Sequence, residues 1–151
     1  MPQRDAAWFD SQYDNRRRVP EFARHVGRWL EDSARARAAL ACHLDLPYMA
    51  GSDVALDVFP AARANAPVLV FIHGGYWRAL DKADFSFVAA PFVAAGSMVV
   101  VPNYSLCPAV TVDTIALQMA RALAWVHRHA ARYGGDAARC VVAGHSAGGH
   151  L

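Results

Sequence analysis

The sequence predicts an α/β protein in which a mostly parallel sheet is flanked by helices. Three short runs, at residues 68–72, 98–101 and 140–143, are apolar throughout. Strands that are apolar on both faces are typical of parallel sheets covered by helices on each side. Residues 83–94 and 112–133, which lie between these runs, have the composition and spacing of helices. We therefore expect a β-α-β-α-β unit with right-handed crossovers.

The residues before this unit are expected to form helices and then an antiparallel strand pair. Residues 1–40 are assigned to a helical segment, in which four apolar residues at helical spacing are expected to face the core: Phe22, Val26, Trp29 and Leu30. Residues 43–46 and 54–59 alternate in polarity and are joined across a Gly-Ser turn, a pattern typical of a hairpin. Residues 41–151 are assigned to the α/β domain, which ends in the serine motif discussed below.

Composition favours a globular protein and excludes several classes of partner. The chain has 151 residues, of which 55% are hydrophobic and 19% charged, and its net charge is +2. Its one basic run, Arg16 to Arg18, is too short for the basic stripe that nucleic-acid recognition requires. The sequence contains no run long enough to span a membrane and no apolar leader at its start. We expect a cytoplasmic protein without nucleic-acid or membrane partners.

The three cysteines give no indication of a metal or redox site. Cys42, Cys107 and Cys140 are widely spaced and form no C-x-x-C pair. They are expected to be buried thiols, and neither a metal nor a cofactor is predicted.

A serine motif near residue 146 indicates nucleophilic catalysis. The run Gly144-His145-Ser146-Ala147-Gly148 directly follows the predicted strand at residues 140–143 and begins a predicted helix. This is the strand-turn-helix setting of a nucleophile elbow. Such a turn strains the serine backbone by about 1–3 kcal/mol, and the flanking glycines leave room for it. Ser146 is therefore the candidate nucleophile.

A glycine-containing loop after the first parallel strand can supply the oxyanion hole. A serine nucleophile generates an oxyanion that requires preorganised N–H donors. The run His73-Gly74-Gly75-Tyr76-Trp77 follows residues 68–72 at the strand end where α/β proteins bind ligands. With little side-chain obstruction, its amides can act together with the amide after the serine. Tyr76 and Trp77 are candidates for the substrate pocket, although aromatic residues at a pocket mouth also serve ordinary packing.

These motifs resemble one family of enzymes. Residues 71–78 resemble the HGGxW motif of the kynurenine formamidase (arylformamidase) group of α/β-hydrolases, which is related to the hormone-sensitive-lipase-like esterases. Residues 102–108 resemble the Y-x-L-x-P segment of that superfamily, and residues 144–151 resemble its elbow. The resemblance extends from the N-terminal helices to the last residue. Ser105 and Cys107 stand where relatives often have Arg and Ala, a departure that concerns loop packing rather than chemistry.

The resemblance implies roles for particular residues and an order for the strands. Ser146 is the implied nucleophile, and the amides of Gly75, Tyr76 and Ala147 are the implied oxyanion donors. Gly74 belongs to the same oxyanion-hole loop and shapes it. The implied sheet order is 1-2-4-3-5-6-7-8, with the first five strands in this chain.

The implied activity is hydrolysis of the N-formyl amide of N-formylkynurenine-like substrates, a step of tryptophan catabolism, through an acyl-enzyme. A carboxylesterase acting on small acyl esters is the first alternative. A non-catalytic remnant or interaction module is an alternative of another class. The partner is expected to be a small-molecule substrate, and a homodimer of the full-length protein is left open.

The acid and base of the catalytic triad are not expected in this chain. In the family the order is Ser, then Asp or Glu, then His, on loops after later strands. None of the seven histidines of the chain is expected to be the base, because each belongs to the oxyanion loop, the elbow, a helix or the first strand. The sequence therefore predicts an N-terminal half without strands 6–8, which is inactive on its own.

Overall fold

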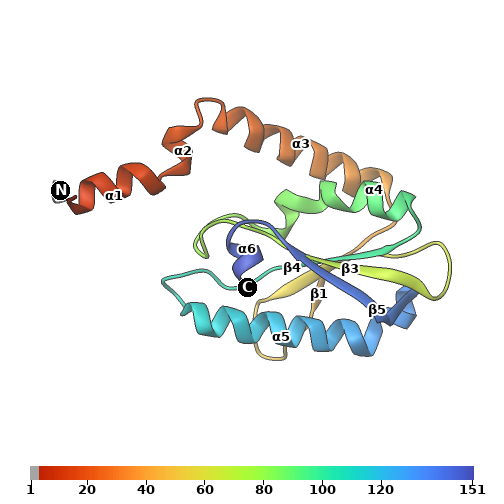
Figure 1. The fold of residues 1–151 in the computed structure, drawn as a ribbon. Helices are drawn as coiled ribbons and strands as arrows, with labels where there is room; N and C mark the ends of the chain where they lie inside the picture. The colour runs from red at the N-terminus through yellow and green to blue at the C-terminus, as the bar shows by residue number, and fades with distance from the viewer. Residues whose placement is uncertain (1–3) are drawn as a thin grey trace.

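The computed structural model describes residues 4–151, which form a sheet with helices on both faces (Figure 1). The helix α5 covers one face of the sheet, and α3 and α4 lie over the other. This layered arrangement confirms the expected α/β class. The strands are β1 (His43–Pro47), β2 (Ala55–Phe59), β3 (Ala66–Ile72), β4 (Met98–Pro102) and β5 (Gly135–Gly144). The helices are α1 (Ala6–Tyr13), α2 (Asn15–Arg18), α3 (Phe22–Ala39), the 3₁₀ helix η1 (Lys82–Val88), α4 (Ala89–Ala94), α5 (Val112–His129), the 3₁₀ helix η2 (Ala130–Tyr133) and α6 (Ala147–His150).

The five strands lie in the order β1-β2-β4-β3-β5, as the family resemblance implied for the first five. The pair β1–β2 is antiparallel, as expected, and β2 also pairs antiparallel with β4. Strand β3 pairs parallel with β4 on one side and with β5 on the other. The β3–β5 register joins Ile72 to Gly144, so these two strands end side by side.

The continuous apolar runs of β3 and β4 are explained by two cores, one on each face of the sheet, whereas in β5 Val141 and Val142 are 62% and 47% exposed. Because successive strand residues point to opposite faces, Val68 and Val70 pack with Ile115 and Met119 of α5. The alternate residue Leu69 packs in a second cluster around Phe85 of η1. Burial of both faces therefore favours apolar residues throughout β3 and β4.

The predicted core stripe of the N-terminal segment is only partly correct. Trp29 is half-buried and its ring centroid lies 5.7 Å from that of Phe85, whereas Leu30 is 46% exposed. The buried residues of α3 are instead Ser33 and Ala36. The sequence pattern placed the contact face about one helical turn too early.

The predicted contact face of α3 was displaced because α3 contacts η1 through hydrogen bonds as well as through apolar packing. The Ser33 hydroxyl donates to the Asp84 carbonyl oxygen at 2.9 Å and accepts from the Phe87 amide at 3.1 Å. The Arg37 guanidinium donates to the Ser86 hydroxyl at 2.9 Å and to the Ala83 carbonyl oxygen. A search for apolar periodicity cannot detect such a face.

The two crossover segments differ slightly from the helices that the sequence predicts. The expected helix at residues 83–94 is a 3₁₀ helix, η1, followed by α4. Asp81 caps η1 by accepting from the Ala83 amide at 2.9 Å. The second helix ends in the short η2 at Gly134, whose φ of 81° is the left-handed conformation expected of its glycine cap.

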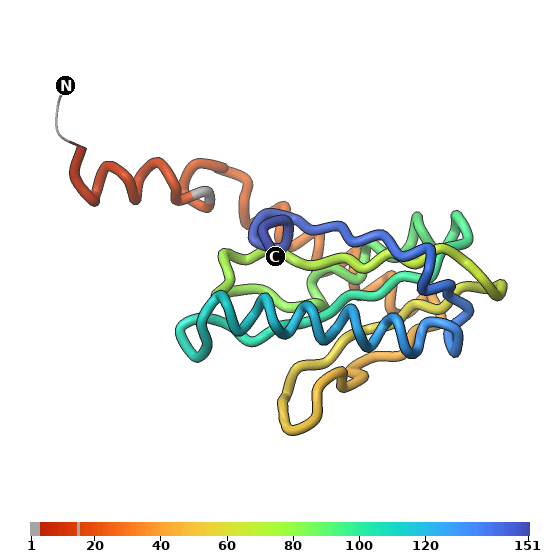
Figure 2. Tube along the Cα trace, turned by 60° about the horizontal axis from the view of Figure 1, so that its bottom comes forward, coloured from red at the N-terminus to blue at the C-terminus, as the bar shows by residue number. Residues whose placement is uncertain are grey.

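The periphery of the structure includes one segment that extends away from the sheet. Helices α1 and α2 project from the layered body (Figure 2), and α1 has no buried residue.

Among residues 4–151, none of the helices combines the length and apolar character that a membrane crossing requires. Cys42, Cys107 and Cys140 are free and half-buried, so the expectation of buried thiols was only partly correct.

Two glycine substitutions should have opposite effects on stability. A β-carbon at Gly135 would lie 2.7 Å from Val68 Cγ2 and 2.5 Å from Met98 Sδ, whereas one at Gly27 in α3 meets nothing within 4 Å. We expect Gly135→Ala to lower the free energy of unfolding by about 1–3 kcal/mol through overpacking. Gly27→Ala should raise it by about 0.5–1 kcal/mol, because alanine loses less backbone entropy in a helix. Urea unfolding measures both, and a stabilising Gly135→Ala would contradict the packing described at the start of β5.

Candidate active site

The candidate nucleophile lies in a sharp turn between β5 and α6. Ser146 has φ 54° and ψ −118°, a conformation that residues with a side chain rarely adopt. It is exposed and immediately precedes the first residue of α6. The strand-turn-helix arrangement and the strained serine are those of a nucleophile elbow.

The glycines around the serine are required by close backbone contacts. A β-carbon at Gly144 would lie 2.2 Å from the Gly148 carbonyl oxygen, and one at Gly148 would lie 2.1 Å from the Ile72 carbonyl oxygen. The His145 amide also donates to the Ile72 carbonyl oxygen at 3.1 Å. The elbow is therefore folded tightly on itself and bound to the end of β3.

The loop at residues 74–80, here called the oxyanion loop, lies directly against this elbow. A β-carbon at Gly74 would lie 3.2 Å from Ser146 Cβ and 2.8 Å from His145 Nδ1. Gly75 has φ 123°, and a β-carbon there would lie 1.8 Å from the Ala79 carbonyl oxygen. Both glycines are needed for close approach, the first to the elbow and the second within the loop.

The backbone amides of this region are free to bind a ligand oxygen. Among residues 4–151, no hydrogen-bond acceptor is found for the amides of Gly74, Gly75, Tyr76 or Ala147. Free amides of this kind beside a serine are the donors that an oxyanion requires. The structure thus brings the three predicted donors, Gly75, Tyr76 and Ala147, and the loop glycine Gly74 to the same edge of the sheet as Ser146.

His73 connects β3 to the oxyanion loop and is fully buried. Its ring stacks on Tyr104 with centroids 4.3 Å apart and on Phe85 with centroids 5.6 Å apart. Its Nδ1 lies 2.7 Å from the Gly74 carbonyl oxygen and its Nε2 lies 3.0 Å from Asn103 Oδ1. These contacts are those of a structural residue rather than of a catalytic base.

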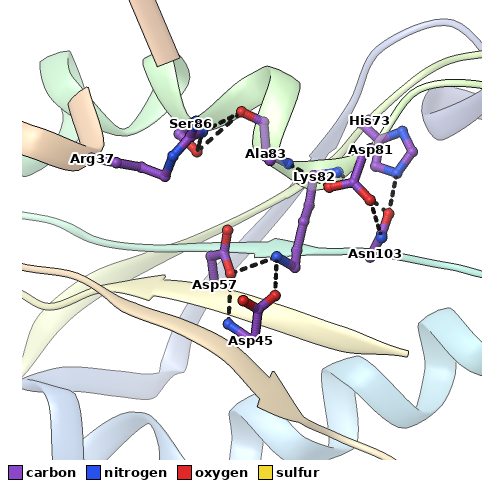
Figure 3. Close-up of polar contacts among 9 residues, drawn as sticks. All are labelled: Arg37, Asp45, Asp57, His73, Asp81, Lys82, Ala83, Ser86 and Asn103. Carbon is purple, nitrogen blue, oxygen red and sulfur yellow. Dashed lines mark hydrogen bonds and ion pairs between the residues drawn. The ribbon is translucent and has the colours of Figure 1, made fainter. Parts of the chain in front are cut away.

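Asn103, at the end of β4, joins the two ends of the oxyanion loop (Figure 3). Besides its contact with His73, its Oδ1 accepts from the Lys82 amide at 3.3 Å. Its Nδ2 donates to Asp81 Oδ2 at 2.6 Å. Sequence reasoning missed this role, although a polar residue directly after a buried strand beside β3 is a signal that could have indicated it.

The two aromatic candidates for the substrate pocket have different environments. Tyr76 is 58% exposed, and the Arg78 guanidinium lies 5.3 Å from its ring centroid. Trp77 is half-buried and, like Leu106 and Cys107, packs against the core on the α5 face of the sheet. The Cys107 amide donates to the Trp77 carbonyl oxygen at 2.8 Å. Tyr76 is therefore accessible to a ligand, whereas Trp77 holds the loop to the segment after β4.

No imidazole of residues 4–151 is hydrogen-bonded to the Ser146 hydroxyl. The two nearest in sequence have other partners: the His145 ring lies 6.1 Å from the Trp29 ring, and the His150 ring lies 5.2 Å from the Trp77 ring. In the same residues, no three His, Cys, Asp or Glu side chains gather in a way that could hold a metal ion. The expectation that the triad base and acid lie elsewhere stays a prediction.

Comparison with known proteins identifies the family. Residues 56–151, which include the oxyanion loop and the elbow, match the BD-FAE family. The chain therefore belongs to the BD-FAE family, within the kynurenine formamidase and esterase group of α/β-hydrolases.

Three individual proteins illustrate what the chain is similar to. The chain is 31% identical to a kynurenine formamidase of Salmo salar over 144 residues, which cover 93% of the chain and 48% of that relative. It is 38% identical to a carboxylesterase of Mycobacterium tuberculosis over 104 residues, 66% of the chain and 32% of that relative. A solved structure from a Silicibacter species, described as a candidate thioesterase, is 33% identical with a TM-score of 0.83, over 94% of this chain and 53% of that one. The chain spans about half the length of the first and third of these proteins, and less of the second.

The buried His73 should make stability sensitive to acid. Burial lowers the pKa of His73 below its ordinary value of 6.5, and this effect exceeds the opposing effect of its hydrogen bonds to Gly74 and Asn103. Because the folded pKa is the lower one, the stabilisation is complete above about pH 6.5 and is lost as the pH falls towards the folded value. The free energy of unfolding, measured in urea between about pH 7.5 and 5, should fall more steeply for the native protein than for His73→Gln. Equal slopes would contradict a lowered pKa for the buried His73.

Proposed function

We propose that the complete protein is a serine hydrolase of arylformamidase type, which removes the formyl group from an N-formylated aromatic amine such as N-formylkynurenine. The observation that carries the proposal is the strained Ser146 placed against the free amides of residues 74–76. Similarity to kynurenine formamidases supports the substrate class. Exposed Tyr76, in the same loop, offers a surface for an aromatic ring.

In the proposed reaction, Ser146 Oγ attacks the formyl carbon and transfers its proton to a general base. The amides of Gly75, Tyr76 and Ala147 donate to the resulting oxyanion, and Gly74 allows the loop to approach the serine. The C–N bond then breaks, the arylamine takes up the proton, and a formyl ester remains on Ser146. Water hydrolyses this ester to formate and restores the hydroxyl.

We propose that the general base and its acidic partner come from residues outside 4–151. Two observations support this: no imidazole within that range is bonded to Ser146, and the relatives extend over about twice the matched length. Residues 1–151 would then provide the nucleophile and the oxyanion hole. Without the base, they are expected to retain at most the modest rate that binding and the oxyanion hole supply.

A carboxylesterase is the second candidate, because a carboxylesterase of Mycobacterium tuberculosis is 38% identical over the matched region. The same elbow and amides serve an ester as well as a formamide. The two reactions differ in the leaving group, because an amine must be protonated as it departs whereas an activated phenolate need not be. The ratio of kcat/KM on N-formylkynurenine to that on p-nitrophenyl acetate therefore separates them.

The identity of the nucleophile is tested by covalent labelling of the complete gene product. A fluorophosphonate should modify Ser146, and Ser146→Ala should abolish both labelling and turnover. Ser97→Ala is the matched control and should retain both. Ser97 directly precedes β4, whose first residue pairs with Val68 near the start of β3, whereas the elbow follows the opposite ends of β3 and β5. Labelling of another residue would contradict the assignment, and the absence of any labelling would favour the non-catalytic alternative.

The oxyanion loop is tested by a glycine pair with similar backbone strain. Gly75 and Gly96 both have positive φ, 123° and 88°, but a β-carbon meets Ala79 at the first and open space at the second. We expect Gly75→Ala to lower kcat by about 10²–10³, the range for loss of one oxyanion donor. Gly96→Ala should cost stability but leave kcat near its original value. Equal losses of kcat in steady-state kinetics would show that backbone strain, and not the loop, is responsible.

A further inference from the structure

Lys82 is the first residue of η1 and directly follows the oxyanion loop and Asp81. It is only 6% exposed. Its ammonium lies 2.8 Å from Asp57 Oδ1 and 2.7 Å from Asp45 Oδ1 (Figure 3). A lysine is rarely buried unless its charge is paired. The burial of Lys82 therefore depends on its two carboxylate partners.

The two carboxylates are held by the first two strands. Asp57 is 1% exposed in β2, where it pairs with Val101 of β4. Its Oδ1 also accepts from the Asp45 amide at 2.9 Å. Asp45 has φ 57° and lies where the β1–β2 register shifts between His43 and Leu46. This bulge turns both the amide and the carboxylate of Asp45 towards the buried charges.

The charged groups of Lys82, Asp45 and Asp57, here called the Lys82 cluster, stabilise one another. Burial by itself would lower the pKa of Lys82, but its hydrogen bonds and attraction to Asp45 and Asp57 outweigh burial and raise the pKa. The ammonium is therefore charged at neutral pH. Removing it alone would leave the buried Asp57 without a cation, which is strongly unfavourable.

The cluster also reaches the oxyanion loop through the backbone of the same residue. The Lys82 amide donates to Asn103 Oδ1, which lies 3.0 Å from His73 Nε2. His73 precedes the loop and Lys82 follows it, so Asn103 joins the two ends. The Lys82 side chain then connects the C-terminal end of the oxyanion loop to Asp57 of β2, within the sheet.

We propose that Lys82 is a positioning residue that, through its ion pair with Asp57, holds the oxyanion loop at the distance from Ser146 that the reaction requires. The inference rests on the proposed function and deepens it. Lys82 lies at the end of the loop opposite to His73 and acts through the loop backbone. Misplacement of catalytic groups by about 1 Å can lower a rate by about 10², so loss of this tie reduces the rate of acylation and leaves ground-state binding largely intact.

The experiment compares three variants of the complete gene product. Lys82→Met removes the cation. The double variant Lys82→Met with Asp57→Asn removes both buried charges, while the substituted carboxamide can still accept from the Asp45 amide. Arg37→Met is the matched control, because Arg37 binds the same η1 helix through Ala83 and Ser86 without joining the loop to β2. Urea unfolding establishes the folded fraction of each variant before kinetics are measured.

The inference predicts that the double variant, once shown to be folded, loses about tenfold to hundredfold in kcat with KM changed by less than about twofold. Arg37→Met should retain its kcat at equal folded fraction. If the double variant keeps the original kcat, or if Arg37→Met loses as much, the positioning role is wrong.

Amide hydrogen exchange provides a readout that does not depend on turnover. In the double variant, exchange of the hydrogen-bonded amides of Arg78, Asp81 and Lys82 should accelerate by about tenfold or more, while that of β4 stays unchanged. Unchanged exchange in the loop would overturn the inference even if the enzyme is active. An inactive parent protein with accelerated loop exchange would instead reject the proposed function and support the tie between Lys82 and the loop.

Discussion

The parallel pairing of β3 with β5 is the constraint on which the candidate site depends. Its register places Ile72 beside Gly144, so both strands end at the same edge of the sheet. The chain leaves β3 into the oxyanion loop and leaves β5 into the elbow. The backbone pairing therefore brings the candidate donor amides and the candidate nucleophile, which are far apart in sequence, to the same edge of the sheet. The Ile72 carbonyl oxygen accepts from the His145 amide. This hydrogen bond extends the backbone pairing of β3 and β5 into the first residue of the elbow turn.

Such close backbone approach leaves no space for β-carbons at particular positions. Gly148 approaches the end of β3, and Gly74 approaches Ser146 and His145. The strained φ of Ser146 persists because the surrounding backbone is already fixed on both sides. The site is thus built from main-chain geometry, and the two cores on either face of the sheet keep that geometry in place.

Buried polar groups add conformational specificity that apolar packing alone would lack. His73, Asn103 and Lys82 connect the ends of the oxyanion loop to each other, and Asp57 connects them to the sheet. Burying these groups is costly unless each has a partner. Because the partners come from different strands, all hydrogen bonds of this network form in one arrangement of the loop. A single loop arrangement is what preorganised donors require.

The sequence by itself determined the apolar strands, the glycine-rich loop, the elbow with Ser146 and, through family resemblance, the strand order. These features are local or periodic, so they can be read along the chain. Only the tertiary structure decided that α3 contacts η1 through Ser33 and Arg37, that Asn103 joins the ends of the loop, and that Lys82 pairs with Asp57. Each of these contacts joins polar residues far apart in sequence. Their pairing depends on strand register and on the bulge at Asp45, and hydrophobic periodicity contains no information about either.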